Sequence, residues 1–94
     1  MNALTNNYAN DHYNATMAAA ELEETEKEIS RLTAEMEEHQ EAAEHFAGKG
    51  LEERAECYQE IVERLTGLIE ELESEAQALK DEIELFKAEN KRAA

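Results

Sequence analysis

Hydrophobic residues recur at alternating intervals of three and four along residues 51–90. With Ala55 at heptad position a, positions a and d hold Leu51, Ala55, Tyr58, Val62, Leu65, Ile69, Leu72, Ala76, Leu79, Ile83, Phe86 and Asn90. A repeat of 3.5 residues kept over five heptads predicts a long helix with coiled-coil packing. Ile61 and Leu68 at position g add a second apolar stripe, which a bundle of several helices requires and a strict two-stranded seam does not.

Residues 15–47 follow the same heptad rule with weaker residues. Positions a and d of this segment hold Ala15, Ala18, Leu22, Thr25, Ile29, Leu32, Met36, His39, Ala43 and Phe46. The register extends only loosely before Ala15, and Asn14 or Asp11 is a suitable N-cap because a short polar side chain satisfies free amides there. This pattern predicts a first helix over residues 15–47.

The segment Gly48-Lys49-Gly50 is the only strong helix breaker in the sequence. Gly48 suits the left-handed residue that follows a helix C-terminus, and Glu52 and Glu53 suit the first turn of the next helix. So short a break predicts two antiparallel neighbours. The resulting pairing sets Phe46 against Leu51, with the further pairs His39–Tyr58, Leu32–Leu65, Ile29–Ile69, Leu22–Ala76 and Ala18–Leu79.

The predicted fold is therefore all-α, a long antiparallel helical hairpin with five parts. These are an Asn- and Tyr-rich arm (1–14), helix one (15–47), the turn (48–50), helix two (51–90) and a tail (91–94). The core seam is predicted to hold Leu22, Ile29, Leu32, Met36, Phe46, Leu51, Tyr58, Ile61, Val62, Leu65, Leu68, Ile69, Leu72, Leu79, Ile83 and Phe86.

Composition favours association of this hairpin with a second copy. Ala, Glu, Leu, Lys and Arg make up 56 of the 94 residues, which is typical of long helices and coiled coils. Sixteen of the hydrophobic residues are Ala, so few large side chains remain to build a core in a small chain. We expect a homodimer that forms an antiparallel four-helix bundle, with a monomeric hairpin as the alternative.

The net charge of −15 restricts the classes of partner. Direct binding to nucleic acid or to an anionic membrane is disfavoured, whereas a basic protein is attracted. In a second interpretation, the negative charge serves only to keep the helices soluble. The sequence shows no apolar run able to span a bilayer and no secretory signal, and its only cysteine is Cys57, so we expect a cytoplasmic protein.

Catalytic, cofactor and metal sites are not expected. A di-iron bundle needs Glu three residues before His, and the residues at that distance from His12, His39 and His45 are Ala9, Met36 and Ala42. Glu41 and His45 share a helical face, but a surface coincidence explains them better than a metal site. Nucleophilic catalysis by Cys57 would need a nearby His or another activating cation, and the surrounding Glu53, Glu56 and Glu60 favour its interpretation as an inert thiol.

Two polar features have alternative interpretations. His39 at a core d position forms either a polar layer that fixes the helix register or a pH-sensitive joint. The nearly uncharged arm contains Tyr8, His12 and Tyr13 among five Asn. Tyr with Asn suits an adaptable recognition surface, and the alternatives are a frayed tail or the capped end of helix one.

These features predict a non-enzymatic binding protein, an inhibitor that occupies the basic, nucleic-acid-binding surface of a protein. In size, acidity and helical build it resembles the DNA-mimic and anti-defence proteins that phages carry, without a shared sequence motif. The expected partner-binding residues are Tyr8, His12, Tyr13, Glu37, Glu38, Glu41, Glu52 and Glu53. The alternative function is a structural homo-oligomeric coiled-coil scaffold or adaptor.

Overall fold

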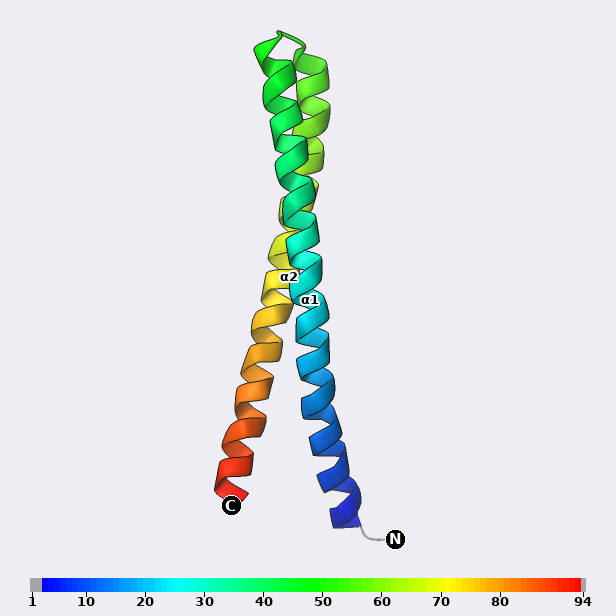
Figure 1. The fold of residues 1–94 in the computed structure, drawn as a ribbon, viewed down its shortest axis with the longest axis vertical. Coiled ribbons are helices and arrows are strands. Elements are labelled where there is room, and N and C mark those ends of the chain that lie inside the picture. Colours follow the sequence, from blue (N-terminus) through cyan, green and yellow to red (C-terminus); the bar gives the residue numbers. More distant parts are fainter. Residues whose placement is uncertain (1–2, 94) are drawn as a thin grey trace.

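The computed structural model of the protein describes the backbone of residues 3–93 and the side chains of residues 15–90. The described chain forms two helices, α1 (Ala3–Gly48) and α2 (Glu52–Ala93), which pack against each other. Figure 1 shows that the Ala3 end of α1 and the Ala93 end of α2 lie at the same end of the molecule and that the turn lies at the other. The molecule measures 70 × 24 × 14 Å, and the predicted all-α helical hairpin is confirmed.

The contact between the helices follows the heptad positions. Among residues 15–90, the seven buried hydrophobic residues all occupy position a or d: Ala18, Leu32, Ala43, Val62, Leu65, Ile69 and Ala76. Leu32, Leu65 and Ile69 form the central cluster, and Ile29, Met36, Ile61 and Leu72 pack around it. An ion pair of 3.9 Å between Lys80 and Glu26 joins position e of each helix, as antiparallel pairing requires. Position g of each helix therefore lies on the opposite flank.

The turn differs from the sequence prediction in the position of its left-handed residue. Gly50 has a φ of 76°, whereas Gly48 is the last residue of α1. The Leu51 amide donates to the Phe46 carbonyl at 2.9 Å, and the Gly50 amide donates to the Ala47 carbonyl at 3.0 Å. These two bonds define a Schellman motif, in which Gly50 is the residue that needs a positive φ.

The helix boundaries also differ from those predicted. Helix α1 begins at Ala3 rather than at Ala15, so residues 3–14 are helical backbone instead of a separate arm. Neither Gly nor Pro occurs in that stretch, and Asn costs a helix only a fraction of a kcal/mol, so a possible cap at Asn14 does not end it. Helix α2 runs from Glu52 to Ala93 rather than over 51–90.

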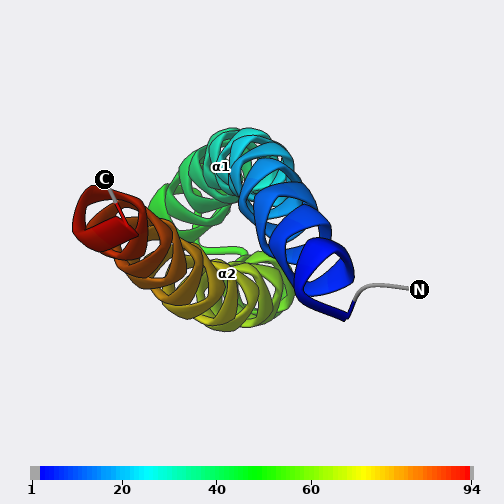
Figure 2. The ribbon, with the colours of Figure 1, turned by 90° about the horizontal axis from the view of Figure 1, so that it is seen from below.

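Packing is tight at the turn and in the middle, and the helices separate towards the chain ends. Figures 1 and 2 show α1 and α2 winding around each other and then diverging, so that the N- and C-terminal ends lie on opposite sides. Within residues 15–90, the buried residues nearest the diverging ends are both small, Ala18 in α1 and Ala76 in α2. Among the described residues no helix is long and apolar enough to cross a membrane.

Candidate functional site

An aromatic cluster lies where the two helices meet beside the turn. The Tyr58 ring of α2 stacks on His39 of α1 at 5.9 Å between centroids, and on Phe46 of α1 at 5.4 Å. His45 meets the Phe46 ring edge-on at 5.5 Å. The predicted pairing of His39 with Tyr58 agrees with this geometry. The Phe46 ring packs on Tyr58, and Leu51, expected opposite Phe46, lies outside α2 with 44% of its surface exposed.

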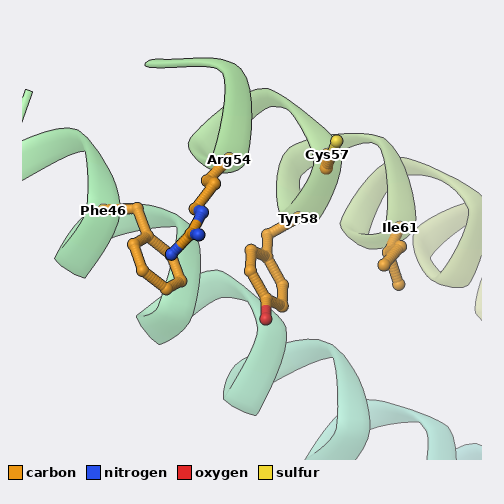
Figure 3. A pocket seen from close by; sticks show the side chains of 5 residues that line it. All are labelled: Phe46, Arg54, Cys57, Tyr58 and Ile61. Carbon is orange, nitrogen blue, oxygen red and sulfur yellow. The ribbon is translucent and has the colours of Figure 1, made fainter. Parts of the chain in front are cut away.

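A shallow pocket of about 350 Å³ opens onto this cluster. Its lining consists of Phe46, Arg54, Cys57, Tyr58 and Ile61. Figure 3 shows the Arg54 side chain extending across to the Phe46 ring, with Tyr58 and Ile61 following along α2. The guanidinium carbon lies 5.7 Å from the centre of the Phe46 ring, which is within the range of a cation–π contact. The pocket therefore offers an apolar wall with one cationic edge.

The sequence did not predict this pocket. Phe46, which stacks on Tyr58, forms part of its lining, and a heptad assignment gives the direction of a position without giving the side-chain rotamer. Arg54 at position g, seven residues before the apolar Ile61, was the only sequence signal available.

Acidic side chains cover the outer surface of α2 in its turn-proximal half. We define the α2 acidic ridge as Glu53, Glu56, Glu60, Glu63 and Glu70, which follow positions f and b and are all exposed. The predicted partner-binding residues Glu37, Glu38 and Glu41 of α1 and Glu52 and Glu53 of α2 are exposed as well, in the same turn-proximal half of the hairpin. The side chains of Tyr8, His12 and Tyr13 lie outside the described residues.

The predicted seam residues divide into two groups. Leu51 and Leu68 are exposed by 44% and 48%, and the other fourteen are buried or half-buried. Exposure of Leu51 follows from its place in the turn, whereas Leu68 is exposed although Ile61, also at position g, packs against the central cluster. Leu68 therefore belongs to the surface of the hairpin.

Within residues 15–90, the ion pair of Glu28 and Arg31 is the one whose pKa values depart clearly from their ordinary values. Arg31 donates a hydrogen bond to Glu28, and this bond, more than the accompanying charge attraction, holds the pKa of the Glu28 carboxyl below its ordinary value. The same contact raises the pKa of Arg31. Both groups are exposed and lie on one helix, so the pair supports α1 locally.

Residues 15–90 contain no group of three or more His, Cys, Asp or Glu side chains arranged to hold a metal ion. Comparison of the chain with known protein families, with curated proteins and with solved structures gives no significant match.

Proposed function

We propose that this protein is a non-enzymatic inhibitor that occupies the basic, nucleic-acid-binding surface of a protein partner. The observation that carries the proposal is the concentration of charge near the turn. Residues 22–75 contain 18 acidic and 5 basic residues, which accounts for 13 of the 15 net negative charges. These residues fold into a section of rod about 38 Å long, at 1.5 Å per helical residue.

The charge density of this section is comparable with that of nucleic acid. It amounts to one net negative charge per about 3 Å of rod, against one per about 1.7 Å of axis in double-stranded DNA. The carboxylates are fixed on helices, so their spacing is set before binding and little conformational entropy is lost. A basic groove therefore meets a preorganised anionic surface, and nucleic acid competes for the same groove.

Charge reversal on the α2 acidic ridge tests this function. The tagged chain is used to capture partners from nuclease-treated lysate, and bound proteins are eluted with a salt gradient. We expect a basic protein that leaves at moderate salt, because attraction between exposed charges is screened. The variant Glu56→Lys/Glu60→Lys/Glu63→Lys should lose this protein.

The matched control is Glu82→Lys/Glu84→Lys/Glu89→Lys, which makes the same change of net charge on α2 outside the dense section. It should retain the partner, and circular dichroism of both variants should show unchanged helix content. Equal capture by the ridge variant and the wild type, or elution independent of salt, would contradict the proposal.

The second candidate function is a homo-oligomeric scaffold or adaptor, favoured by the amount of exposed surface. The chain exposes 7419 Å², whereas a compact monomer of 10.7 kDa is expected to expose about 5,500 Å². A dimer that forms a four-helix bundle covers part of this excess, and we propose it as the assembly for either function. Light scattering behind a sizing column tests the dimer, and a mass near 10.7 kDa at micromolar concentration would contradict it.

A further inference from the structure

One face of α2 differs from the rest of the charged surface. Arg54, Cys57, Ile61, Arg64 and Leu68 follow one another at intervals of three and four residues, so they share a single helical face. We call this face the Arg–apolar stripe. No acidic residue interrupts it. Ile61 is half-buried, and the other four side chains are exposed, Leu68 by 48%.

The two arginines of the stripe have no carboxylate partner among the described residues. Lys27, Arg31, Lys80 and Lys87 each lie within 4.0 Å of a Glu. No such ion pair involves Arg54 or Arg64, although the described chain is strongly acidic. The Arg54 guanidinium instead lies over the Phe46 ring at the edge of the pocket. Arginine is enriched at protein–protein interfaces relative to the rest of the surface, and these two arginines flank an apolar pocket and an exposed leucine.

We propose that a second copy of this chain docks on the Arg–apolar stripe, with its α2 antiparallel to the first and the two-fold axis near Ile61. This inference rests on the proposed dimer and assigns its interface. Under that symmetry residue 54 lies level with residue 68 of the other copy, because both are seven residues from the axis. The contact is therefore made twice, once at each end of the stripe.

The pocket receives Leu68 of the second copy in this arrangement. A helical side chain covers the surface on the N-terminal side of its own Cα. Leu68 starts level with Arg54, and the antiparallel direction carries its side chain towards Cys57 and Tyr58. Arg54, Cys57 and Tyr58 line the pocket of about 350 Å³. The exposed Leu68 of each copy is thus buried in the apolar pocket of the other copy.

The charges of the two copies are complementary in the same arrangement. Arg64 of the second copy lies level with residue 58 of α2, which pairs in the hairpin with His39 of α1. Glu38, which precedes His39, is exposed on the g flank of α1 and accepts this arginine. Arg54 of the second copy lies level with Leu68, one turn before Glu71. Each stripe arginine therefore gains a carboxylate.

In the dimer that this symmetry requires, the two hairpins overlap along only part of their length. The two α2 helices run side by side over residues 52–70, a length of about 28 Å at 1.5 Å per residue. This overlap joins the turn-proximal halves into a four-helix segment, and the open ends of the hairpins point away from each other. The particle is about 110 Å long, against 70 Å for one hairpin. The α2 acidic ridge, on another face of the helix, stays exposed.

Disulfide trapping tests the face and the direction together. In a Cys57→Ser background, single cysteines are introduced as I61C, L68C or E60C, and each chain is oxidised under native conditions. We expect a covalent dimer with I61C, because residues at the axis approach closely. Two L68C residues lie about 21 Å apart along the axis, beyond the reach of a disulfide. E60C lies on the acidic ridge and should also remain uncrosslinked.

Substitution of Leu68 provides the second measurement. Leu68→Glu should raise the dimer dissociation constant by about tenfold or more, since a buried leucine contributes at least that factor. The control Leu85→Glu changes another exposed leucine of α2, 64% exposed and outside residues 52–70, and should leave dissociation unchanged. Small-angle scattering should give a maximum dimension near 110 Å.

The outcomes separate this inference from the proposed dimer. A monomeric wild-type chain overturns both. A wild-type dimer that tolerates Leu68→Glu, or that crosslinks through L68C or E60C and not through I61C, overturns the assigned interface and leaves the dimer standing. The ridge-dependent capture of a basic partner is measured separately with the Glu56, Glu60 and Glu63 variant.

Discussion

Replacing Leu65 with Ala removes the centre of the contact between the two helices. Leu65 is 9% exposed and packs with Leu32 and Ile69, which are 6% and 7% exposed. The substitution deletes three carbons from a nearly buried side chain, and at about 0.8 kcal/mol per buried carbon the lost transfer free energy is about 2.2 kcal/mol. Incomplete closure of the resulting gap brings the expected loss to about 2–3 kcal/mol.

Urea and thermal unfolding followed by circular dichroism at 222 nm measure this loss. For a chain of this size, 1 kcal/mol corresponds to about 4–8 °C, so the melting temperature should fall by about 10–20 °C. All samples are compared at one protein concentration, because self-association stabilises the folded state by mass action.

The control is Leu85→Ala, which changes a side chain that is 64% exposed. It should cost less than about 1 kcal/mol. A double-mutant cycle with Leu32→Ala then tests the pairing across the hairpin, and the two substitutions should be coupled by at least about 0.5 kcal/mol. The reasoning would be refuted if Leu65→Ala were no more destabilising than Leu85→Ala. It would also be refuted if the effects of Leu32→Ala and Leu65→Ala were strictly additive.

Four further predictions concern local features of the two helices and of the turn. Gly67→Ala should stabilise the chain by about 1 kcal/mol, because Gly67 lies within α2 with nothing within 4 Å of an added Cβ. Gly50→Ala should destabilise it by about 1–2 kcal/mol, because Gly50 has a φ of 76°. The melting temperature should rise for the first variant and fall for the second, and shifts in the same direction would contradict these predictions. Because its folded-state pKa is lowered from 4.5, Glu28 should contribute stability above that pH and lose it as the pH falls through the lowered value; carbon-detected NMR titration should show this midpoint, and Arg31→Gln should return it towards 4.5. Glu26→Gln removes an exposed ion pair with Lys80, and the free energy of unfolding measured in urea should fall by less than about 1 kcal/mol. A larger fall would show that this ion pair contributes more to the contact between the helices than an exposed pair does.

Heptad spacing predicted the hairpin because burial of a continuous apolar seam dominates the energetics of two long helices. Leu32, Leu65 and Ile69 were placed in that seam from their spacing alone, and His39 was placed opposite Tyr58 by counting from the turn. Position g was harder to interpret. Ile61 reaches the central cluster, whereas Leu68 at the equivalent position stays exposed, so its heptad position did not decide its environment.

Local signals were less reliable at the ends of the helices. The sequence offered Asn14 as a cap and Gly48 as a left-handed residue, and both residues were compatible with those roles. The chain instead continues α1 back to Ala3 and turns at Gly50. In each case the difference between two local conformations is a fraction of a kcal/mol to about 1 kcal/mol, so an adjacent helical turn or one extra hydrogen bond decides the outcome.

The aromatic cluster and its pocket could not be predicted from spacing, because they depend on the rotamer of a single ring. Two apolar residues of the second half of the chain were candidates to pack on Phe46: Leu51 in the turn, and Tyr58, which follows it by seven residues or about two helical turns. Stacking at 5.4 Å between Phe46 and Tyr58 leaves the shallow pocket beside Arg54 and Cys57. The sequence contains no motif that assigns a function to the charged surface. The charge-reversal variants of the α2 acidic ridge test that function instead.

The placement of both chain ends at one pole determines how this rod can be tethered. A surface or a fused domain attached through either terminus holds the same pole, so the turn projects about 70 Å into solution in both cases. The acidic ridge and the Arg–apolar stripe then lie in the half of the rod that is farther from the support. Immobilised capture experiments can therefore use an N- or a C-terminal linker, and the two orientations serve as replicates of one geometry.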